Sequence, residues 1–366
     1  MTAAADGLDI AFFGSSLVSS WWNGAATYYR GIIRGLAGLG HHVTFHEPTA
    51  YDRQQHRDIP DPPWARVVVY EATDETAVRS QVGRAADADV VVKTSGVGAF
   101  DDVLEDAVHG LDGPVKVLWD VDAPATLGRM EGDPADPLIP LLPGYDAVFT
   151  YGGGAPVERR YLALGARRVD IVYNALDPTT HHPAPPDARF DADLALLANR
   201  LPDREARVEE LFLRAAALRP DLRFLLGGNG WADKAVPPNV RVLGHVGTAE
   251  HNAFNCSARS VLNVTRESMA ANGWSPATRV FEAAGAGACL VTDAWEGIDD
   301  FLEPGAEVLV AHDGADVAAH LDALDASRAG AIGAAAMARV LAEHTYDHRA
   351  VQVHALLRQL CSGRRS

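Results

Sequence analysis

Short apolar runs rich in β-branched residues alternate with amphipathic stretches along the whole chain. In the first half these runs cover residues 8–13, 42–45, 66–70, 89–93, 115–119, 147–150 and 169–173. The alternation restarts in the second half with runs at 194–197, 222–226, 240–243, 260–264, 288–292 and 308–310. Such alternation is the pattern of parallel sheets that are covered by helices. The sequence therefore predicts an α/β protein.

A segment dense in proline, residues 177–186, separates the two series of runs. Because proline fixes φ and donates no backbone hydrogen bond, this segment is the expected linker. The chain has 366 residues, more than a single hydrophobic core usually supports. We expect two Rossmann-like domains, 1–180 and 181–340, that face an interdomain cleft. A C-terminal helix within 341–366 is expected to return to the first domain.

The charge of the chain excludes some partners. Acidic side chains number 49 against 32 basic ones, a net charge of −17. This charge repels phosphate backbones and gives no general attraction to anionic membranes, so we expect no nucleic acid partner and no stable membrane insertion. Cys256, Cys289 and Cys361 have no CxxC spacing, and no basic, apolar leader opens the chain. A cytoplasmic location is the expectation.

The second half contains a predicted helix N-terminus that could bind an anion. Ser275 followed by Pro276 predicts an N-cap with proline at the first helical position, where free N–H groups and the helix dipole favour negative charge. Glu282 would share a face of that helix with Thr278. The turn Gly228-Asn229 lets backbone N–H groups approach a ligand, although an ordinary strand-to-helix turn has the same composition.

Charged residues follow predicted strands in both halves. Arg200 and Arg204 come after the run 194–197, and arginine suits phosphate because it pairs bidentately and stays charged. They could instead pair with neighbouring carboxylates. Asp120 and Asp122 follow the run 115–119 and would share one side if the strand continues through them. Such carboxylates could orient or deprotonate a hydroxyl group, or stabilise positive charge, or they could serve a turn before Pro124.

Near the start of the chain, Ser15 follows the first run, and Trp22-Asn23-Gly24 precedes the first long helical pattern. Aromatic faces near a cleft suit the C–H faces of sugars, but aromatic side chains also cap cores. The histidines at 41, 42, 46, 181 and 182 form no HExxH pattern, so we interpret them as surface or linker residues. No metal site is expected.

The stretch 240–310 resembles the C-terminal domain of the CgeB-like glycosyltransferases, relatives of the group 1 (retaining, GT-B) enzymes. The resemblance rests on 262–266, Ser275-Pro276, Arg279 and 281–283, and in the first half on Asn23-Gly24 and 119–126. It implies that Glu282 accepts hydrogen bonds from a nucleotide ribose and that residues 275–278 meet its diphosphate. Group 1 enzymes carry a second Glu eight positions earlier, where this chain has Trp274.

The predicted function is transfer of a sugar from a nucleoside diphosphate sugar to a hydroxyl or amine of a small-molecule or glycan acceptor. A GT-B enzyme needs no metal or other cofactor, because fixed cations and dipoles stabilise the leaving group. A homodimer is also considered. The expected catalytic residues are Asp122, Asp120 and Arg200; the expected donor-binding residues are Arg204, Gly228, Asn229, Asn263, Arg266, Ser275, Thr278, Arg279 and Glu282; the expected acceptor-binding residues are Ser15, Trp22, Asn23 and Gly24.

Four alternatives stay open. A sugar-nucleotide 2-epimerase has a similar fold. A pyridoxal-dependent phosphorylase needs a Schiff-base lysine, and the only lysines are Lys93, Lys116 and Lys234, none of them in the donor helix. A non-catalytic structural or spore-surface protein is the alternative from another class. Finally, Asp120-Val121-Asp122 is a DxD, the signature with which GT-A enzymes hold a divalent ion on the donor diphosphate.

Overall fold

The computed structural model describes residues 7–21 and 23–364, so the expected acceptor residue Trp22 lies outside the described residues. The chain divides into two compact units. Unit 1 comprises Met1–Tyr173 and Tyr346–Ser366, and unit 2 comprises Asn174–Thr345. The division falls before the proline-dense segment 177–186, which belongs to unit 2. No helix in the described ranges combines the length and apolar character that a bilayer crossing requires.

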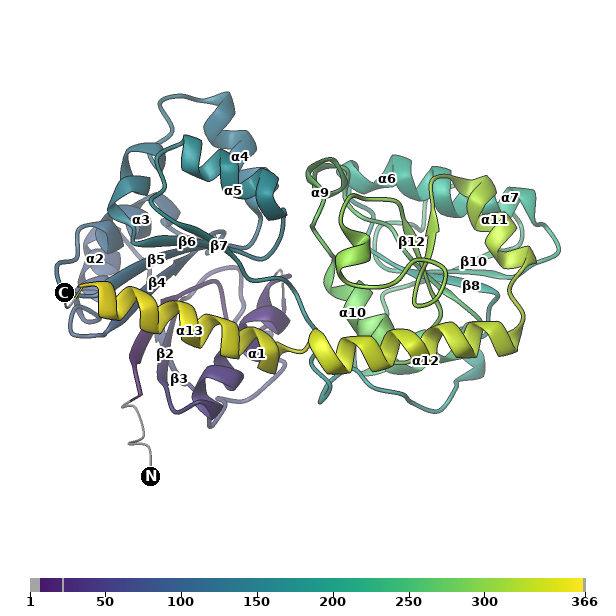
Figure 1. The fold of residues 1–366 in the computed structure, drawn as a ribbon, viewed down its shortest axis with the longest axis horizontal. Helices are drawn as coiled ribbons and strands as arrows, with labels where there is room; N and C mark the ends of the chain where they lie inside the picture. The colour runs from purple at the N-terminus through teal and green to yellow at the C-terminus, as the bar shows by residue number, and fades with distance from the viewer. Residues whose placement is uncertain (1–6, 22, 365–366) are drawn as a thin grey trace. The chain divides into compact units, whose positions relative to one another are not determined.

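Within the described residues, unit 1 is built on seven parallel strands in the order β3-β2-β1-β4-β5-β6-β7 (Figure 1). The strands are β1 (Asp9–Phe13), β2 (His42–Pro48), β3 (Arg66–Tyr70), β4 (Val90–Thr94), β5 (Val115–Asp120), β6 (Ala147–Thr150) and β7 (Val169–Ile171). The helices are α1 (Ala26–Gly38), α2 (Glu75–Gly83), α3 (Asp101–His109), α4 (Ala123–Gly132), α5 (Gly154–Ala163) and α13 (Tyr346–Arg364), with a 3-10 helix at Ile139–Gly144. The strands β4, β5 and β6 are buried at every position, which explains their continuous apolar runs.

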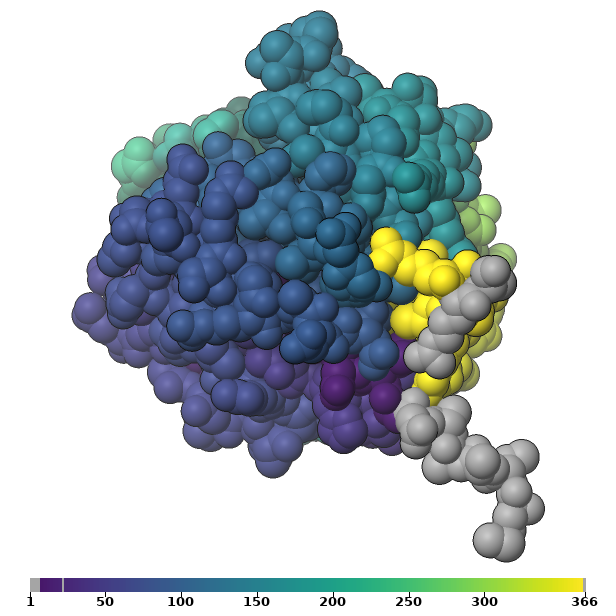
Figure 2. All heavy atoms as spheres, turned by 90° about the vertical axis from the view of Figure 1, so that its left-hand side faces the viewer, coloured from purple at the N-terminus to yellow at the C-terminus, as the bar shows by residue number. Residues whose placement is uncertain are grey.

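The C-terminal helix α13 packs against α1, as expected from the sequence. Gly31 and Gly35 stand four residues apart on α1 and lie under α13. A Cβ on Gly31 would lie 2.2 Å from the ring of Tyr346, and a Cβ on Gly35 would lie 2.4 Å from the Cβ of Ala350. The two helices approach closely because these positions carry no side chain. Figure 2 shows the C-terminal residues in yellow on the surface of unit 1, beside purple residues from the start of the chain.

Unit 2 repeats the architecture with six parallel strands in its described residues, in the order β10-β9-β8-β11-β12-β13. The strands are β8 (Leu194–Leu197), β9 (Phe224–Gly227), β10 (Val240–Gly244), β11 (Val261–Asn263), β12 (Leu290–Asp293) and β13 (Leu309–Ala311). The helices are α6 (Pro202–Val208), α7 (Arg214–Leu218), α8 (His251–Ser257), α9 (Glu267–Asn272), α10 (Thr278–Gly285), α11 (Gly314–Asp322) and α12 (Ala326–Glu343). A π-helical turn, Glu209–Leu213, joins α6 to α7, and short 3-10 helices lie at Ala188–Phe190, Thr248–Glu250 and Ile298–Asp300.

Both sheets have the strand order of a Rossmann fold, so the predicted two-domain α/β architecture is confirmed. The order reverses between β1 and β4 in unit 1 and between β8 and β11 in unit 2. In open parallel sheets, ligands bind beyond the carboxyl ends of the strands at such a reversal. The loops that follow β8 and β11 are therefore the first place to look for a site in unit 2.

Candidate active site

The loops after β8 and β9 lie against each other. Gly228 has a φ of +120°, and a Cβ there would lie 2.1 Å from the carbonyl oxygen of Ala198, so only glycine fits. The N–H of Asn229 donates to Oδ1 of Asn199 at 2.9 Å, and the N–H of Arg200 donates to the carbonyl of Asn229 at 2.9 Å. The structure thus brings the expected residues Gly228, Asn229 and Arg200 together.

The two expected arginines of this region differ in their partners. Arg200 is ion-paired with Glu205 at 2.7 Å and with Asp233 at 3.1 Å. Arg204 has no carboxylate partner among the described residues, and its Nε is buried without a hydrogen bond. Burial, followed by the nearby charge of Arg279, lowers the pKa of Arg204 to about 10, although the charge of Asp203 opposes this shift. A half-buried guanidinium that contacts no carboxylate favours the arrival of an anion.

Further cations come from the loop after β11 and from α10. Nη1 of Arg279 donates to Oδ1 of the buried Asn263 at 3.3 Å, and no described carboxylate forms an ion pair with Arg279. Burial lowers the pKa of Arg279, while the Glu282 carboxylate opposes that shift. Arg266 donates from Nε to Asp203 at 2.7 Å. The result is a concentration of positive charge in which Arg204 and Arg279 are not neutralised by contact.

The helix expected to begin at Ser275 begins later. Its first residue is Thr278 and its N-cap is Ala277, so the prediction of a Ser275 cap was wrong. The Ser275 hydroxyl instead donates to the carbonyl of Gly273 at 2.8 Å, within a turn where Gly273 and Trp274 both have positive φ. Ser275 and Pro276 therefore lie between this turn and the first residue of α10.

Trp274, which stands where group 1 enzymes carry a first Glu, has a structural explanation. Its φ is +40°, a conformation that bulky residues rarely adopt. Its N–H donates to the carbonyl of Glu296 at 2.6 Å, and its indole N–H donates to Asp300 at 2.7 Å. A Cβ on Gly297 would lie 2.3 Å from its ring, so the ring packs directly against that glycine. The Trp274 side chain thus anchors the turn that precedes α10.

Glu282 lies four residues after Thr278 on α10, so the two share a helix face as predicted. Its carboxylate lies 3.8 Å from Nε2 of His181. His181, His251 and Glu282 each offer a ligand atom, and these atoms all lie within 4.8 Å of one another. Sequence reasoning missed this group because its members are widely separated along the chain.

The interpretation of the histidines as surface or linker residues was wrong for some of them. His41, His46 and His181 are buried, whereas His42 and His182 are exposed. His41 hydrogen-bonds His354, and His46 hydrogen-bonds Gln81. These contacts join distant parts of the chain, which a local helical spacing pattern cannot detect.

In unit 1, Asp120 and Asp122 would share a strand face only if the strand continued through both, and β5 ends at Asp120. The buried Asp120 carboxylate accepts hydrogen bonds from Ser95 at 2.6 Å, from the N–H of Asp122 at 2.9 Å, from Thr126 at 3.0 Å and from the Tyr161 hydroxyl. Asp122 is half-buried at the N-cap position of α4. Asp120 therefore holds the loop that positions Asp122, and its oxygens are occupied by protein donors, which disfavours a metal-binding DxD.

The expected acceptor residues Ser15 and Asn23 contact each other. Ser15 Oγ donates to Oδ1 of Asn23 at 2.8 Å, and Nδ2 of Asn23 donates to the carbonyls of Ser16 and Ser19 at 2.7 and 2.9 Å. Asn23 is buried, so it stabilises the loop between β1 and α1. Gly24 is exposed.

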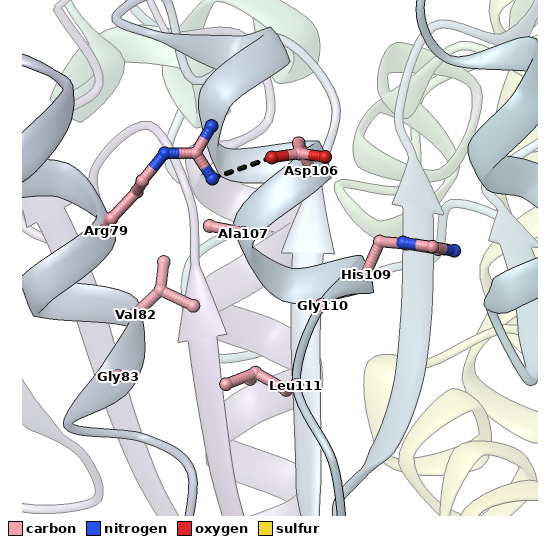
Figure 3. A pocket seen from close by; sticks show the side chains of 8 residues that line it. All are labelled: Arg79, Val82, Gly83, Asp106, Ala107, His109, Gly110 and Leu111. Atoms are coloured by element: carbon pink, nitrogen blue, oxygen red, sulfur yellow. Dashed lines mark hydrogen bonds and ion pairs between the residues drawn. The ribbon is translucent and has the colours of Figure 1, made fainter.

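A pocket of about 300 Å³ lies elsewhere in unit 1 (Figure 3). Its lining comes from the C-terminal parts of α2 and α3, including Gly83 and His109, and an ion pair of 2.6 Å joins Arg79 to Asp106 across it. Helices in a parallel α/β unit run opposite to the strands, so their C-terminal ends lie at the amino ends of the strands. The pocket is therefore at the wrong edge of the sheet for the expected ligand site.

Comparison with solved structures shows which fold this is. The chain is similar to sucrose-phosphate synthase from Thermosynechococcus elongatus, with a TM-score of 0.71, 14% identity, and coverage of 97% of this chain and 100% of that one. It is also similar to Alr3699/HepE from Anabaena in complex with UDP and glucose, with a TM-score of 0.68, 14% identity, and coverage of 96% and 100%. AviGT4, a glycosyltransferase involved in avilamycin A biosynthesis, has a TM-score of 0.61 and 16% identity, with coverage of 97% and 98%. These similarities show the GT-B fold.

The sequence comparisons concern the second half of the chain. Residues 204–355 match the model of the glycosyl transferase-like family. No curated protein matches the sequence. The matched segment contains Arg204, Asn263, Arg279 and Glu282, and its family description names the class of enzyme that uses the GT-B fold. The chain thus has the fold of GT-B glycosyltransferases, and its second half is similar to the glycosyl transferase-like family.

Proposed function

We propose that this enzyme transfers a sugar from a nucleoside diphosphate sugar to a hydroxyl or amine acceptor without a metal ion. The observation that carries the proposal is the pair Arg204 and Arg279. Both guanidinium groups are half-buried, neither has an ion-pair partner among the described residues, and they come from segments beside the strand-order reversal of unit 2. A diphosphate would supply the missing negative charge.

The same groups provide the chemistry. Negative charge grows on the diphosphate as the glycosidic bond breaks, so fixed cations lower the barrier of this step without a divalent ion. Arg204 and Arg279 are proposed to bind the diphosphate, together with the N–H groups of the first turn of α10 at Thr278. Arg200 is neutralised by Glu205 and Asp233 and is proposed to hold the loop. Arg204 then takes the leaving-group role.

Glu282 is proposed to accept hydrogen bonds from the ribose hydroxyls. No hydrogen bond from the described part of the chain reaches its carboxylate, and about a fifth of its side chain (19%) is exposed. The Anabaena relative was solved with UDP and glucose, which supports a uridine nucleotide as the first donor to test. On the acceptor side, Asp122 is proposed to orient or deprotonate the acceptor group, or to stabilise positive charge at the anomeric carbon.

Finer parts of the proposal rest on the sequence resemblance. Retention of the anomeric configuration is proposed from the resemblance to group 1 enzymes, and the CgeB-like group is the proposed subfamily. A small molecule or a glycan is the proposed acceptor. A cytoplasmic location and a homodimer are retained as proposals.

The test begins with thermal unfolding against a panel of nucleotides, because a ligand that binds only the native state raises the melting temperature. Calorimetric titration of UDP then compares the parent with Glu282→Ala and with Glu343→Ala, whose exposed carboxylate pairs with Arg339. We expect Glu282→Ala to lose about tenfold or more in affinity, since charge-assisted hydrogen bonds contribute roughly 1.5–3 kcal/mol.

Two results would change the proposal. If no nucleotide stabilises the protein, the donor site is wrong. If the enzyme consumes the donor without any acceptor and releases an epimerised sugar, the 2-epimerase alternative replaces glycosyl transfer.

A further inference from the structure

The cluster of His181, His251 and Glu282 has a second property besides its nearness to the proposed ribose site. His181 lies on the turn that follows Asp177, His251 is the first residue of α8, and Glu282 lies on α10. Their ligand atoms lie within 4.8 Å of one another. Zinc bound at about 2.0–2.1 Å in tetrahedral geometry brings its ligands to roughly 3.3–3.4 Å apart. Modest side-chain rotation would therefore close the cluster around an ion.

The hydrogen bonds of His181 determine which of its ring nitrogens faces the cluster. The Thr180 hydroxyl has one proton, which it donates to the carbonyl of Asp177 at 3.2 Å. Nδ1 of His181 lies 3.0 Å from the same hydroxyl oxygen and is the donor in that contact when the hydroxyl proton is directed at Asp177. Nε2 then carries a lone pair. It is buried without a hydrogen-bond partner, and it lies 3.8 Å from the Glu282 carboxylate.

A lone pair that faces a carboxylate in a buried position is unfavourable, and either a proton on Nε2 or a bound cation between the two groups relieves it. The side chain of His181 is only 4% exposed, so solvent cannot easily provide the compensation. The arrangement therefore favours a bound cation or proton at this position.

His251 makes a backbone hydrogen bond with Val246. The ring centroids of His251 and His181 are 6.2 Å apart. A histidine whose one nitrogen donates to the protein presents the other nitrogen as a ligand, which is the usual arrangement around protein-bound metals.

We propose that His181, His251 and Glu282 bind a divalent transition-metal ion, with zinc the best fit, and that this ion competes with the donor nucleotide for Glu282. Two imidazoles and one carboxylate suit zinc, whereas magnesium prefers oxygen ligands. The competition rests on the proposed function, because it requires Glu282 to bind the ribose. The metal site itself does not depend on that function.

The first experiment measures zinc binding to the full chain without a histidine tag, after removal of metals by a chelator. Calorimetry with ZnCl₂ compares the parent with His181→Gln, His251→Gln and the matched control His182→Gln, whose side chain is exposed beside His181. We expect one zinc ion per chain, at least tenfold weaker binding in both cluster variants, and no change in the control. His251 is only partly buried, so His251→Gln keeps the test valid if His181→Gln fails to fold.

A spectroscopic readout identifies the ligands directly. Co²⁺ in a tetrahedral nitrogen and oxygen site gives visible absorption bands, which should appear in the parent and in His182→Gln and disappear in His251→Gln. Equal zinc affinity in the parent and all variants would overturn the site, since the ion would then bind elsewhere.

The second experiment measures UDP affinity in EDTA and at saturating zinc. We expect zinc to weaken apparent UDP binding at least tenfold in the parent and to have a much smaller effect in His251→Gln. This variant is needed because zinc also binds the diphosphate of free UDP. Zinc bound at the cluster without an effect on UDP would overturn the competition. Failure of UDP to bind in EDTA would overturn the proposed function and leave the metal site standing.

Discussion

Nη1 of Arg279 lies 3.3 Å from Oδ1 of Asn263, and this hydrogen bond joins the first turn of α10 to the end of β11. The amide nitrogen of Asn263 donates to Thr292 Oγ1 at 3.1 Å, which orients the amide so that its oxygen faces the arginine. Asn263 is fully buried, so this orientation is not disturbed by water. A neutral side chain thus holds Arg279 without consuming its charge.

Substitutions of Asn263 should separate orientation from charge. We expect Asn263→Ala to weaken UDP binding about fivefold, because a typical hydrogen bond contributes about 1 kcal/mol. Asn263→Asp should weaken it further, since a carboxylate would neutralise Arg279 and repel the diphosphate. Calorimetric titration measures both, with melting temperatures as a control for folding. Tighter UDP binding by Asn263→Asp would show that Arg279 does not contact the diphosphate.

Arg204 and Arg200 provide a matched comparison. We expect Arg204→Ala to reduce turnover at saturating donor by a larger factor than it weakens donor binding, because the diphosphate charge grows in the transition state. Arg204→Lys should restore only part of the activity. Arg200→Ala should have the smaller effect, since Glu205 and Asp233 already neutralise Arg200. Steady-state kinetics on the three variants decide the matter, and a larger loss in Arg200→Ala would return the leaving-group role to Arg200.

The two aspartates after β5 should respond differently to the same change. We expect Asp122→Asn to abolish turnover while nucleotide affinity stays within about twofold, because the proposed role concerns the acceptor or oxocarbenium charge and not the phosphates. Asp120→Asn should mainly lower stability, by roughly 1.5–3 kcal/mol, since the buried carboxylate accepts several hydrogen bonds. Urea unfolding and kinetics distinguish the two.

Kinetic measurements in the presence of EDTA test the metal-independent mechanism. We expect the parent enzyme to keep its activity when EDTA removes divalent ions. Loss of nucleotide binding on chelation, restored by Mn²⁺, would instead support the DxD interpretation and a donor site in unit 1.

The stability of the protein should fall as the pH is lowered from neutrality. Burial is the main cause that lowers the pKa of both His41 and His46 to about 4, whereas an unfolded histidine titrates near its ordinary pKa of 6.5. Between these values the unfolded state binds protons that the native state does not. The free energy of unfolding should therefore decrease by up to about 1.4 kcal/mol per pH unit for each histidine.

Urea unfolding at roughly pH 7.0 and pH 5.0 checks this pH dependence. These two values lie above and below the ordinary histidine pKa, at which the unfolded chain titrates. The variants His41→Asn and His46→Asn keep a side-chain acceptor near the position of Nδ1 but do not titrate. Each should show a shallower dependence on pH than the parent. An unchanged slope in both variants would mean that other groups control the acid sensitivity.

Much of the fold was determined by local sequence patterns. Strands such as β4 and β5 are buried on both faces and are therefore continuously apolar, which made the two parallel sheets readable from the sequence. The packing of the C-terminal helix on the first unit was also predicted. The sequence did not reveal that this helix packs against Gly31 and Gly35 of α1. The shared helix face of Thr278 and Glu282 also followed from their spacing in the sequence.

Only the tertiary structure decided which of these groups is available to a ligand. Arg200 and Arg204 look equivalent in the sequence, but Asp233, which lies far along the chain, helps to neutralise one of them. Ser275 is a residue type that often caps helices, yet here it belongs to the preceding turn, in which Trp274 has a positive φ and the Ser275 hydroxyl donates to Gly273. Charge availability depends on distances between side chains that the fold brings together from remote positions. Helical and strand periodicity in a sequence indicates only which face of an element is buried. It therefore cannot predict a cluster such as His181, His251 and Glu282, whose members are far apart along the chain.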